Sequence, residues 1–309
     1  MLMNNFKKSK YEISKFGLGT VQFGLDYGFT KRKTQNEVND ILNTAVNNKV
    51  NLIDTAREYG DSEEKIGNFM REYDNDFVIA TKLNLIEDVE SCDYESFRNN
   101  IFQSVDESLN NLNIDKIPIL QLHQVDNTLY SNNDFWSCIE ELKKEKLIIK
   151  FGVSIYGVNE GEFLLDNHGN LIDYLQIPYN IFDRRFDSIF NKIQINNVDL
   201  ITRSTFLKGI IPCSMEDVPD ELNEIKPYKS KLELLSDKLN IPVDELALIF
   251  VYYNKNISST ILGVNSSMEL ENNVNCVTKF NESILDSIDF DDFKISNQKL
   301  IDPREWNSF

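Results

Sequence analysis

The sequence is poor in cysteine and histidine, and both shortages narrow its possible functions. Its 309 residues include four cysteines, which lie far apart and form no Cys-x-x-Cys pair. This spacing indicates neither a disulfide framework nor a zinc site, and it favours the reducing cytoplasm as the location. With only two histidines in the chain, we expect no metal site.

Positive charge is also scarce, because 32 lysines and arginines face 50 acidic residues and give a formal charge of −18. Phosphate-rich partners would be repelled, so nucleic acid and anionic membranes are not expected partners, whereas a small anionic ligand is compatible with this charge. No apolar run is long enough to span a bilayer, and the first residues lack the apolar core of a signal peptide.

Short apolar runs alternate regularly with amphipathic patterns along the whole chain. Most of the runs are continuous, as expected for parallel strands that are buried on both faces. The predicted strands are Phe16–Thr20, Leu52–Asp54, Phe77–Thr81, Ile117–Leu122, Ile148–Val153, Tyr174–Ile177, Asp199–Thr202 and Thr260–Val264.

Helical periodicity fills the intervals between these runs. The predicted helices are Gln35–Asn48, Ser62–Tyr73, Phe97–Leu112, Asp134–Glu145, Glu160–Asp166, Arg185–Gln194, Pro227–Leu239 and Ser266–Lys279. Eight strands with eight helices predict an α/β (β/α)8 TIM barrel, one domain over residues 1–309. A doubly wound sheet would need a glycine-rich first turn that opens a helix, but "GLGTVQFGLDYG" runs on without one.

Three segments fall outside the alternation. Residues 208–226 form a long connection after the seventh strand, and such loops are usually functional. Residues 241–253 predict an extra apolar helix. The tail, from about residue 285 to residue 309, is expected to form a covering C-terminal arm.

Polar residues follow several strands at the end where a barrel carries its active site. Asp54 ends the second strand in "NLIDTAREYGDSEEKIG", and a carboxylate there costs several kcal/mol of desolvation unless it is paired. Lys82 after the third strand is the expected partner, and Tyr59 lies in the loop beyond Asp54. A lysine cation lowers the pKa of a tyrosine, which is ordinarily about 10. Together with His123 after the fourth strand, these residues indicate acid–base chemistry.

The segment "IDTAREYGDSEEKIG" resembles the "DTAxxYGxSExxLG" signature of the aldo/keto reductase superfamily, which are nicotinamide-dependent oxidoreductases on a (β/α)8 barrel. Other similar segments follow in order: "GLGTVQFG", "ATK", "LQLH", "FGVS", "LQIPYN", "TRSTFLKG" and "ILGVNSSMELENNV". The resemblance implies that the family's catalytic tetrad falls on Asp54, Tyr59, Lys82 and His123. Tyr59 would protonate a carbonyl oxygen, Lys82 and Asp54 would tune Tyr59, and His123 would orient the carbonyl.

The resemblance also implies a nicotinamide dinucleotide across the barrel mouth, with NADP(H) as the family default. Ser154 and Gln176 would contact the carboxamide, although Ile155 stands where the family often has asparagine. Arg203 and Ser204 would begin the loop on the pyrophosphate side. The remaining expected cofactor contacts are Gly19, Thr20, Leu207, Gly209, Gly263, Asn265, Glu269 and Asn273.

The family usually holds the 2′-phosphate of NADP with a Lys-Ser pair after the last strand and an arginine one turn later. Those positions are Gly263, Val264 and Glu269 here, so both cations are absent and one is replaced by an acid. Asn265 suits a ribose hydroxyl, and we therefore expect weaker preference for NADP and comparable use of NAD(H). The alternative is that Asn273 or backbone amides at the helix start hold the phosphate.

Other interpretations stay open for the chain and for single residues. The same barrel serves some family members as a cofactor-binding regulatory subunit without turnover, and a metal-dependent barrel hydrolase would need more histidines. The substrate is expected to be a small carbonyl compound, with a sugar-linked carbonyl as the favoured type and with specificity in residues 124–133, 208–226 and 290–309. Ser62 is expected to be a helix N-cap with Glu63 and Glu64 in the first turn, and His168 is expected at the solvated surface.

Overall fold

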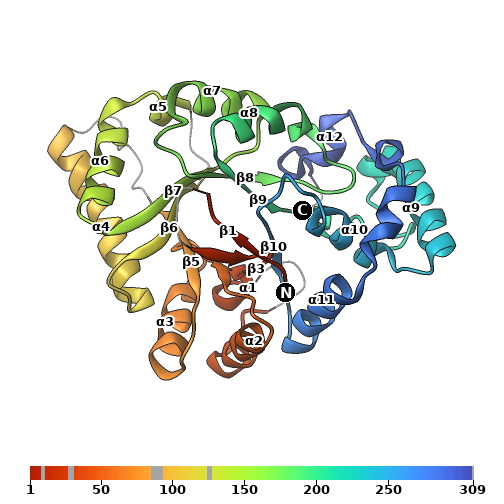
Figure 1. Ribbon diagram of the computed structural model, residues 1–309, viewed down its shortest axis with the longest axis horizontal. Coiled ribbons are helices and arrows are strands. Elements are labelled where there is room, and N and C mark those ends of the chain that lie inside the picture. Colours follow the sequence, from red (N-terminus) through yellow and green to blue (C-terminus); the bar gives the residue numbers. More distant parts are fainter. Residues whose placement is uncertain (8–10, 27–30, 85–92, 124–126, 308–309) are drawn as a thin grey trace.

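Eight parallel strands close into a barrel in chain order, which confirms the predicted TIM barrel (Figure 1). The computed structural model describes residues 1–309 except 8–10, 27–30, 85–92, 124–126 and 308–309. The barrel strands are β3 (Phe16–Gly19), β4 (Leu52–Asp54), β5 (Val78–Leu83), β6 (Ile117–His123), β7 (Ile148–Ser154), β8 (Tyr174–Pro178), β9 (Asp199–Arg203) and β10 (Ser259–Gly263). Each of them lies at a predicted apolar run.

Helices surround this barrel (Figure 1). The longer ones are α2 (Gln35–Asn47), α3 (Ser62–Glu72), α4 (Tyr94–Leu112), α6 (Asn133–Lys144), α7 (Val158–His168), α8 (Phe190–Ile195), α9 (Lys226–Leu239), α10 (Val243–Tyr252) and α11 (Ser267–Lys279). The short ones are α1 (Val21–Gly24), α5 (Asn127–Tyr130) and α12 (Gln298–Ile301). The extra apolar helix is confirmed as α10, whereas the helix predicted over 185–194 is split into the 3₁₀ helix η2 (Arg185–Ile189) and α8. In the described ranges, no helix has both the length and the apolar character that crossing a membrane requires.

An N-terminal hairpin that the sequence did not predict closes the amino end of the barrel. Its strands β1 (Met3–Asn5) and β2 (Glu12–Ser14) pair antiparallel. Phe6 is 1% exposed and packs edge-on against Tyr174 inside the barrel, with ring centroids 6.0 Å apart. Because the hairpin covers this end, access to the barrel axis is left at the carboxyl ends of the strands.

The barrel interior is mostly apolar near the hairpin, apart from the buried Lys150, and polar near the carboxyl ends. Tyr174 fills the lower layer, and Gly152 on the neighbouring strand makes room for it, since a Cβ there would lie 2.2 Å from the tyrosine ring. Above this layer lie the buried polar side chains of Asp54, Lys82 and Gln121. Residues two positions apart on a strand point to the same side of the sheet. The polar side chains near the ends of the strands therefore also point into the barrel, towards its mouth.

A buried lysine of α9 holds the long connection after β9 in place. The connection contains the 3₁₀ helices η3 (Leu207–Gly209) and η4 (Asp220–Ile225). Lys229 of α9 is 1% exposed and donates to the carbonyl oxygens of Ile210, Ile211 and Cys213 at 2.8–3.0 Å. This single ammonium group therefore fixes the first half of the loop.

The tail forms the turns η5 (Glu282–Ser287), η6 (Phe290–Phe293) and η7 (Pro303–Glu305), with α12 between the last two. Arg185 ties it to the barrel by an ion pair with Asp302 at 3.1 Å and a hydrogen bond to the carbonyl of Ile301 at 3.0 Å. Of the segments expected to set specificity, residues 124–126 and 308–309 lie outside the described residues.

The N-cap expected at Ser62 is wrong, whereas Glu63 and Glu64 do lie in the first turn of α3 as expected. The N-cap of α3 is Asp61, whereas Ser62 is fully buried and donates to the hydroxyl of Thr20 at 2.9 Å. Glu63 is also buried, where it accepts a hydrogen bond from Thr81 at 2.6 Å. His168, expected at the solvated surface, is partly exposed at the end of α7, where it stacks on Trp136 with ring centroids 4.1 Å apart.

Candidate active site

Asp54 and Lys82 meet inside the barrel mouth from the adjacent strands β4 and β5. The lysine Nζ lies 2.9 Å from Asp54 Oδ2 and 2.8 Å from the carbonyl of Thr55, and the two side chains are 3% and 8% exposed. Burial would lower the pKa of Lys82, but Asp54 and Tyr59 outweigh it and raise that pKa above its usual value. The site therefore contains a fixed ammonium cation.

The second carboxylate oxygen of Asp54 accepts two further hydrogen bonds. Gln121 on β6 and Gln176 on β8 each donate Nε2 to Asp54 Oδ1 at 2.9 Å. Three donors thus satisfy a carboxylate that would be costly to bury alone. Gln121 was missed by the sequence reasoning, although its position two residues before His123 in "LQLH" places both on one side of the strand.

Tyr59 lies in the loop between β4 and α3, with its ring 4.7 Å from Lys82 Nζ. The loop is seated against α1, since a Cβ on Gly24 would lie 1.7 Å from the carbonyl oxygen of Tyr59. Burial raises the pKa of Tyr59, while Lys82, as expected, and also Arg203 act in the opposite direction. Burial is the larger effect, so the net pKa is raised and the phenol is protonated at neutral pH.

His123 ends β6 and faces Tyr59 edge-on, with ring centroids 6.4 Å apart and planes at 90°. Its Nδ1 lies 2.9 Å from Oε2 of Glu58, the residue directly before Tyr59. Burial and the Lys82 cation lower the pKa of His123, and Glu58 only partly opposes them. Glu58 was not singled out in the sequence, because nothing in "DTAREYG" marks it as a partner of a distant histidine.

Ser154 and Gln176 occupy the strand ends next to His123, in the register His123–Ser154–Gln176 across β6, β7 and β8. Both are buried. The amide nitrogen of Gln176 is bonded to Asp54, so its carbonyl oxygen is the part left for a ligand. The predicted pair is therefore next to the tetrad, with Gln176 serving Asp54 as well.

The loop from Ser204 to Gly209 has an unusual backbone. Ser204, Leu207 and Lys208 adopt left-handed φ angles of 64°, 49° and 51°, and Gly209 has a φ of 91°. Non-glycine residues in this region store strain, which is typical of ligand sites. The side chain of Leu207 is buried, so it anchors the loop in the protein interior and does not point towards solvent.

The guanidinium group of Arg203, at the end of β9, stacks on an aromatic ring. It lies 4.0 Å from the centroid of Tyr156, and Arg304 of the tail lies 3.8 Å from the same centroid. Because Arg203 also lowers the pKa of Tyr59, its charge acts at the candidate site. The stack links the tail to the barrel mouth.

The predicted contacts after β10 are spread over the strand end and α11. Gly263 pairs with Gly19 across β10 and β3, and Thr20 is buried with its hydroxyl bonded to the carbonyl of Asp54 at 3.0 Å. Glu269 folds back, so that its carboxylate accepts from the backbone N–H of Asn265 at 2.7 Å. An acid therefore stands at the start of α11. In the same helix, Asn273 Nδ2 is buried and has no hydrogen-bond partner among the described residues.

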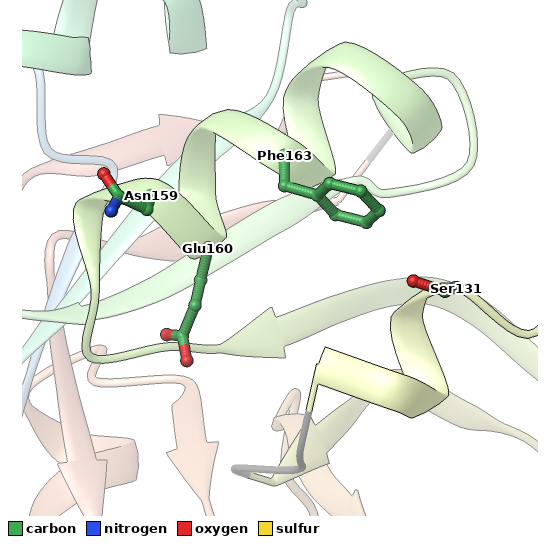
Figure 2. Close-up of a pocket in the computed structure, with 4 residues that line it drawn as sticks. All are labelled: Ser131, Asn159, Glu160 and Phe163. Atoms are coloured by element: carbon green, nitrogen blue, oxygen red, sulfur yellow. The ribbon is translucent and has the colours of Figure 1, made fainter.

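A separate pocket of about 210 Å³ lies on the flank of the barrel, between the end of α5 and α7 (Figure 2). Ser131, Asn159, Glu160 and Phe163 line it. The carboxylate of Glu160 is already bonded to the backbone N–H groups of Tyr156 and Gly157 at 3.1 and 2.9 Å. This pocket contains none of the candidate catalytic residues.

Comparison with known proteins places these observations in one family. The profile of the Aldo/keto reductase family matches residues 15–290. The aldo-keto reductase YhdN of Bacillus subtilis is 27% identical over 231 residues, covering 72% of this chain and 67% of the relative. The L-galactose dehydrogenase of Arabidopsis thaliana is 23% identical, covering 94% and 91%.

Two further similarities bear on fold and on the range of functions. A protein named as a probable voltage-gated potassium channel subunit beta, from Arabidopsis thaliana, is 25% identical over 90% of this chain and 91% of the relative. A solved structure from Pseudomonas aeruginosa that carries the name of an aldo-keto reductase matches with a TM-score of 0.67 at 22% identity, covering 90% of this chain and 95% of the other. This structural match supports the barrel fold.

Proposed function

The chain belongs to the aldo/keto reductase family, and from this membership we propose that it is an NAD(P)H-dependent oxidoreductase that reduces an aldehyde or ketone to an alcohol. The observation that carries the proposal is the array of Asp54, Lys82, Tyr59 and His123 at one barrel mouth. A protonated phenol beside a fixed ammonium can give its proton to a carbonyl oxygen, and Lys82 stabilises the phenolate that remains.

The residues around the tetrad fit a nicotinamide dinucleotide. The strained Ser204–Gly209 loop and the unpartnered buried amide of Asn273 are features that a bound group would explain. Ser154 and the free oxygen of Gln176 would orient its carboxamide, and Arg203 would meet its negative charge. A bound dinucleotide would supply the hydride, while Tyr59 supplies the proton.

The substrate is proposed to be a small carbonyl compound, and a sugar-linked one is favoured. The support comes from a relative named L-galactose dehydrogenase that aligns over 94% of this chain. The first test offers the protein a panel of aldehydes and ketones with NADH or NADPH. Turnover is measured from the absorbance of the reduced nicotinamide. We expect turnover of at least some of them.

The competing function is a barrel that binds the dinucleotide without turnover. The relative named as a channel subunit beta is the reason for considering this function. Tight cofactor binding with no turnover across the whole panel would favour this function over the reductase.

The second test concerns the choice of dinucleotide. Glu269 places a carboxylate at the start of α11, and such a charge repels a 2′-phosphate. We therefore expect NADH to bind at least as tightly as NADPH, and Glu269→Gln to strengthen NADPH binding severalfold while NADH binding stays unchanged. Fluorescence titration of both cofactors measures this, with Glu271→Gln as an exposed acidic control on the same helix. NADPH binding tenfold or more tighter than NADH in the unaltered protein, a difference of about 1.4 kcal/mol, would contradict the idea.

A further inference from the structure

Two enclosed polar atoms inside the barrel have no hydrogen-bond partner among the described residues. They are Oε1 of Gln121 and the hydroxyl oxygen of Tyr174. Both side chains are 0% exposed. Nine in ten or more of the buried polar groups in folded proteins are hydrogen-bonded to protein or to ordered water, so two exceptions inside one barrel require an explanation.

The two residues lie in one row across three adjacent strands. Gln121 on β6 pairs with Gly152 on β7, and Gly152 pairs with Tyr174 on β8. A Cβ on Gly152 would lie 2.2 to 2.5 Å from Cε1, Cδ1 and Cζ of Tyr174, so the tyrosine ring lies over the glycine. The hydroxyl, which Cζ carries, therefore extends from β8 across β7 towards Gln121 on β6. Because the residue between them is glycine, this row places no other side chain between the two polar groups.

The orientation of the Gln121 amide matters for the tetrad. Its Nε2 donates to Asp54 Oδ1 at 2.9 Å, so its Oε1 is the end that needs a donor. If the amide were turned by 180°, Oε1 would face the carboxylate and two acceptors would meet. A donor at Oε1 would therefore hold the amide in the orientation that Asp54 requires.

The hydroxyl of Tyr174 is suited to supply this donor through an intermediary. Burial raises the pKa of Tyr174 well above its usual value, and Asp54 and Asp173 add to this effect, so the hydroxyl keeps its proton. The two side chains are not hydrogen-bonded to each other directly. A water molecule between them can accept from the tyrosine and donate to the glutamine, and buried waters typically make two to four such bonds.

We propose that a buried water molecule binds between the hydroxyl of Tyr174 and Oε1 of Gln121, and that Tyr174 is thereby a positioning residue for Asp54. The contacts then run from Tyr174 through the water and Gln121 to Asp54, which pairs with Lys82 at 2.9 Å. The water site depends only on the fold. The positioning role rests on the proposed carbonyl reduction and deepens it.

The sign of one substitution tests the water site without activity. A bridged hydroxyl contributes about one net hydrogen bond, so Tyr174→Phe should raise the unfolding equilibrium constant about fivefold in denaturant titrations. A buried hydroxyl without any partner costs free energy, so its removal would lower that constant instead. In a Gln121→Met background, which lacks the acceptor, we expect the effect of Tyr174→Phe to disappear. A stabilised Tyr174→Phe variant, or an equal loss of stability in both backgrounds, would overturn the water site.

Crystallography at a resolution that shows ordered water gives an independent measurement. We expect one water within hydrogen-bond distance of both atoms in the unaltered protein, and none at that place in Tyr174→Phe. A direct hydrogen bond between the two side chains, or no water between them, would overturn the site.

The positioning role is tested by the pH profile of carbonyl reduction, which a loss of stability alone does not move. Without the bridge, Gln121 holds Asp54 less firmly, and Lys82 then opposes the raised pKa of Tyr59 less well. We expect kcat of Tyr174→Phe to fall about threefold or more with KM nearly unchanged, and the decline of its rate at alkaline pH to move to higher pH.

Tyr252→Phe is the matched control for this measurement. Tyr252 is 1% exposed on α10, and its hydroxyl accepts from the backbone N–H of Leu2 at 3.1 Å, so its loss should leave the pH profile unchanged. Unchanged kcat and pH profile in Tyr174→Phe would overturn the positioning role. No turnover of the whole carbonyl panel by the unaltered protein would instead contradict the reductase function and the role built on it, while the water site would still stand or fall by unfolding and crystallography.

Discussion

Replacing Tyr59 by phenylalanine is expected to slow carbonyl reduction by about 10²-fold or more, the range that general acids contribute, while dinucleotide binding changes little. The substitution removes one oxygen and keeps the ring. The ring's contacts with Lys82 at 4.7 Å and with His123 at 6.4 Å therefore persist. What is lost is the proton donor, the phenol hydroxyl of Tyr59.

Steady-state reduction with a saturating carbonyl substrate, together with fluorescence titration of the cofactor, measures both parts of this prediction. Tyr73→Phe is a matched control, since Tyr73 is 39% exposed and stacks on Phe69 away from the tetrad. Turnover of Tyr59→Phe close to that of the control would show that Tyr59 is not the proton donor.

Much of the fold could be predicted from the sequence, because buried parallel strands have a recognisable sequence pattern. Strands buried on both faces need continuous apolar runs, and the run that ends at Asp54 became β4 with the same bounds. The meeting of Asp54 and Lys82 was also foreseeable, since polar residues that end adjacent parallel strands point to the same mouth.

Other features depend on contacts that a sequence does not display. Strands β1 and β2 have three residues each, too few for a periodic pattern, and they form because Phe6 packs inside the barrel. The roles of Gln121 and Glu58 depend on which side chains face each other across strands and loops. A local pattern cannot give such a pairing, because its partners are 65 residues or more apart.

The pKa of Tyr59 shows why residue types alone do not fix the electrostatics of a site. The sequence indicated that Lys82 would lower this pKa, and the cation does act in that direction. Burial raises it by more, and the depth of burial is a property of the whole fold. The consequence is a tyrosine suited to donating a proton, which is what reduction requires.

Replacing Lys82 by methionine is expected to affect both stability and chemistry. The side chain is 3% exposed and pairs with Asp54 at 2.9 Å, so methionine leaves a buried carboxylate with two amide donors and no cation. Removing one partner of a buried ion pair typically costs about 3–5 kcal/mol, and we expect the free energy of unfolding to fall by this order. Denaturant unfolding measures it, and Asp54→Asn, which keeps the shape of the site, provides a second variant if Lys82→Met folds poorly.

The pH profile distinguishes a chemical role of Lys82 from a structural one. Since Lys82 lowers the pKa of Tyr59 against the larger effect of burial, its loss should raise that pKa further. Reduction needs the protonated phenol, so its decline at alkaline pH should move to higher pH in Lys82→Met. Oxidation of the alcohol needs the phenolate, so its rise should move in the same direction, while both rates fall by about 10²-fold or more. A folded, still active variant whose two profiles match those of the unaltered protein would show that Lys82 only holds Asp54 in place.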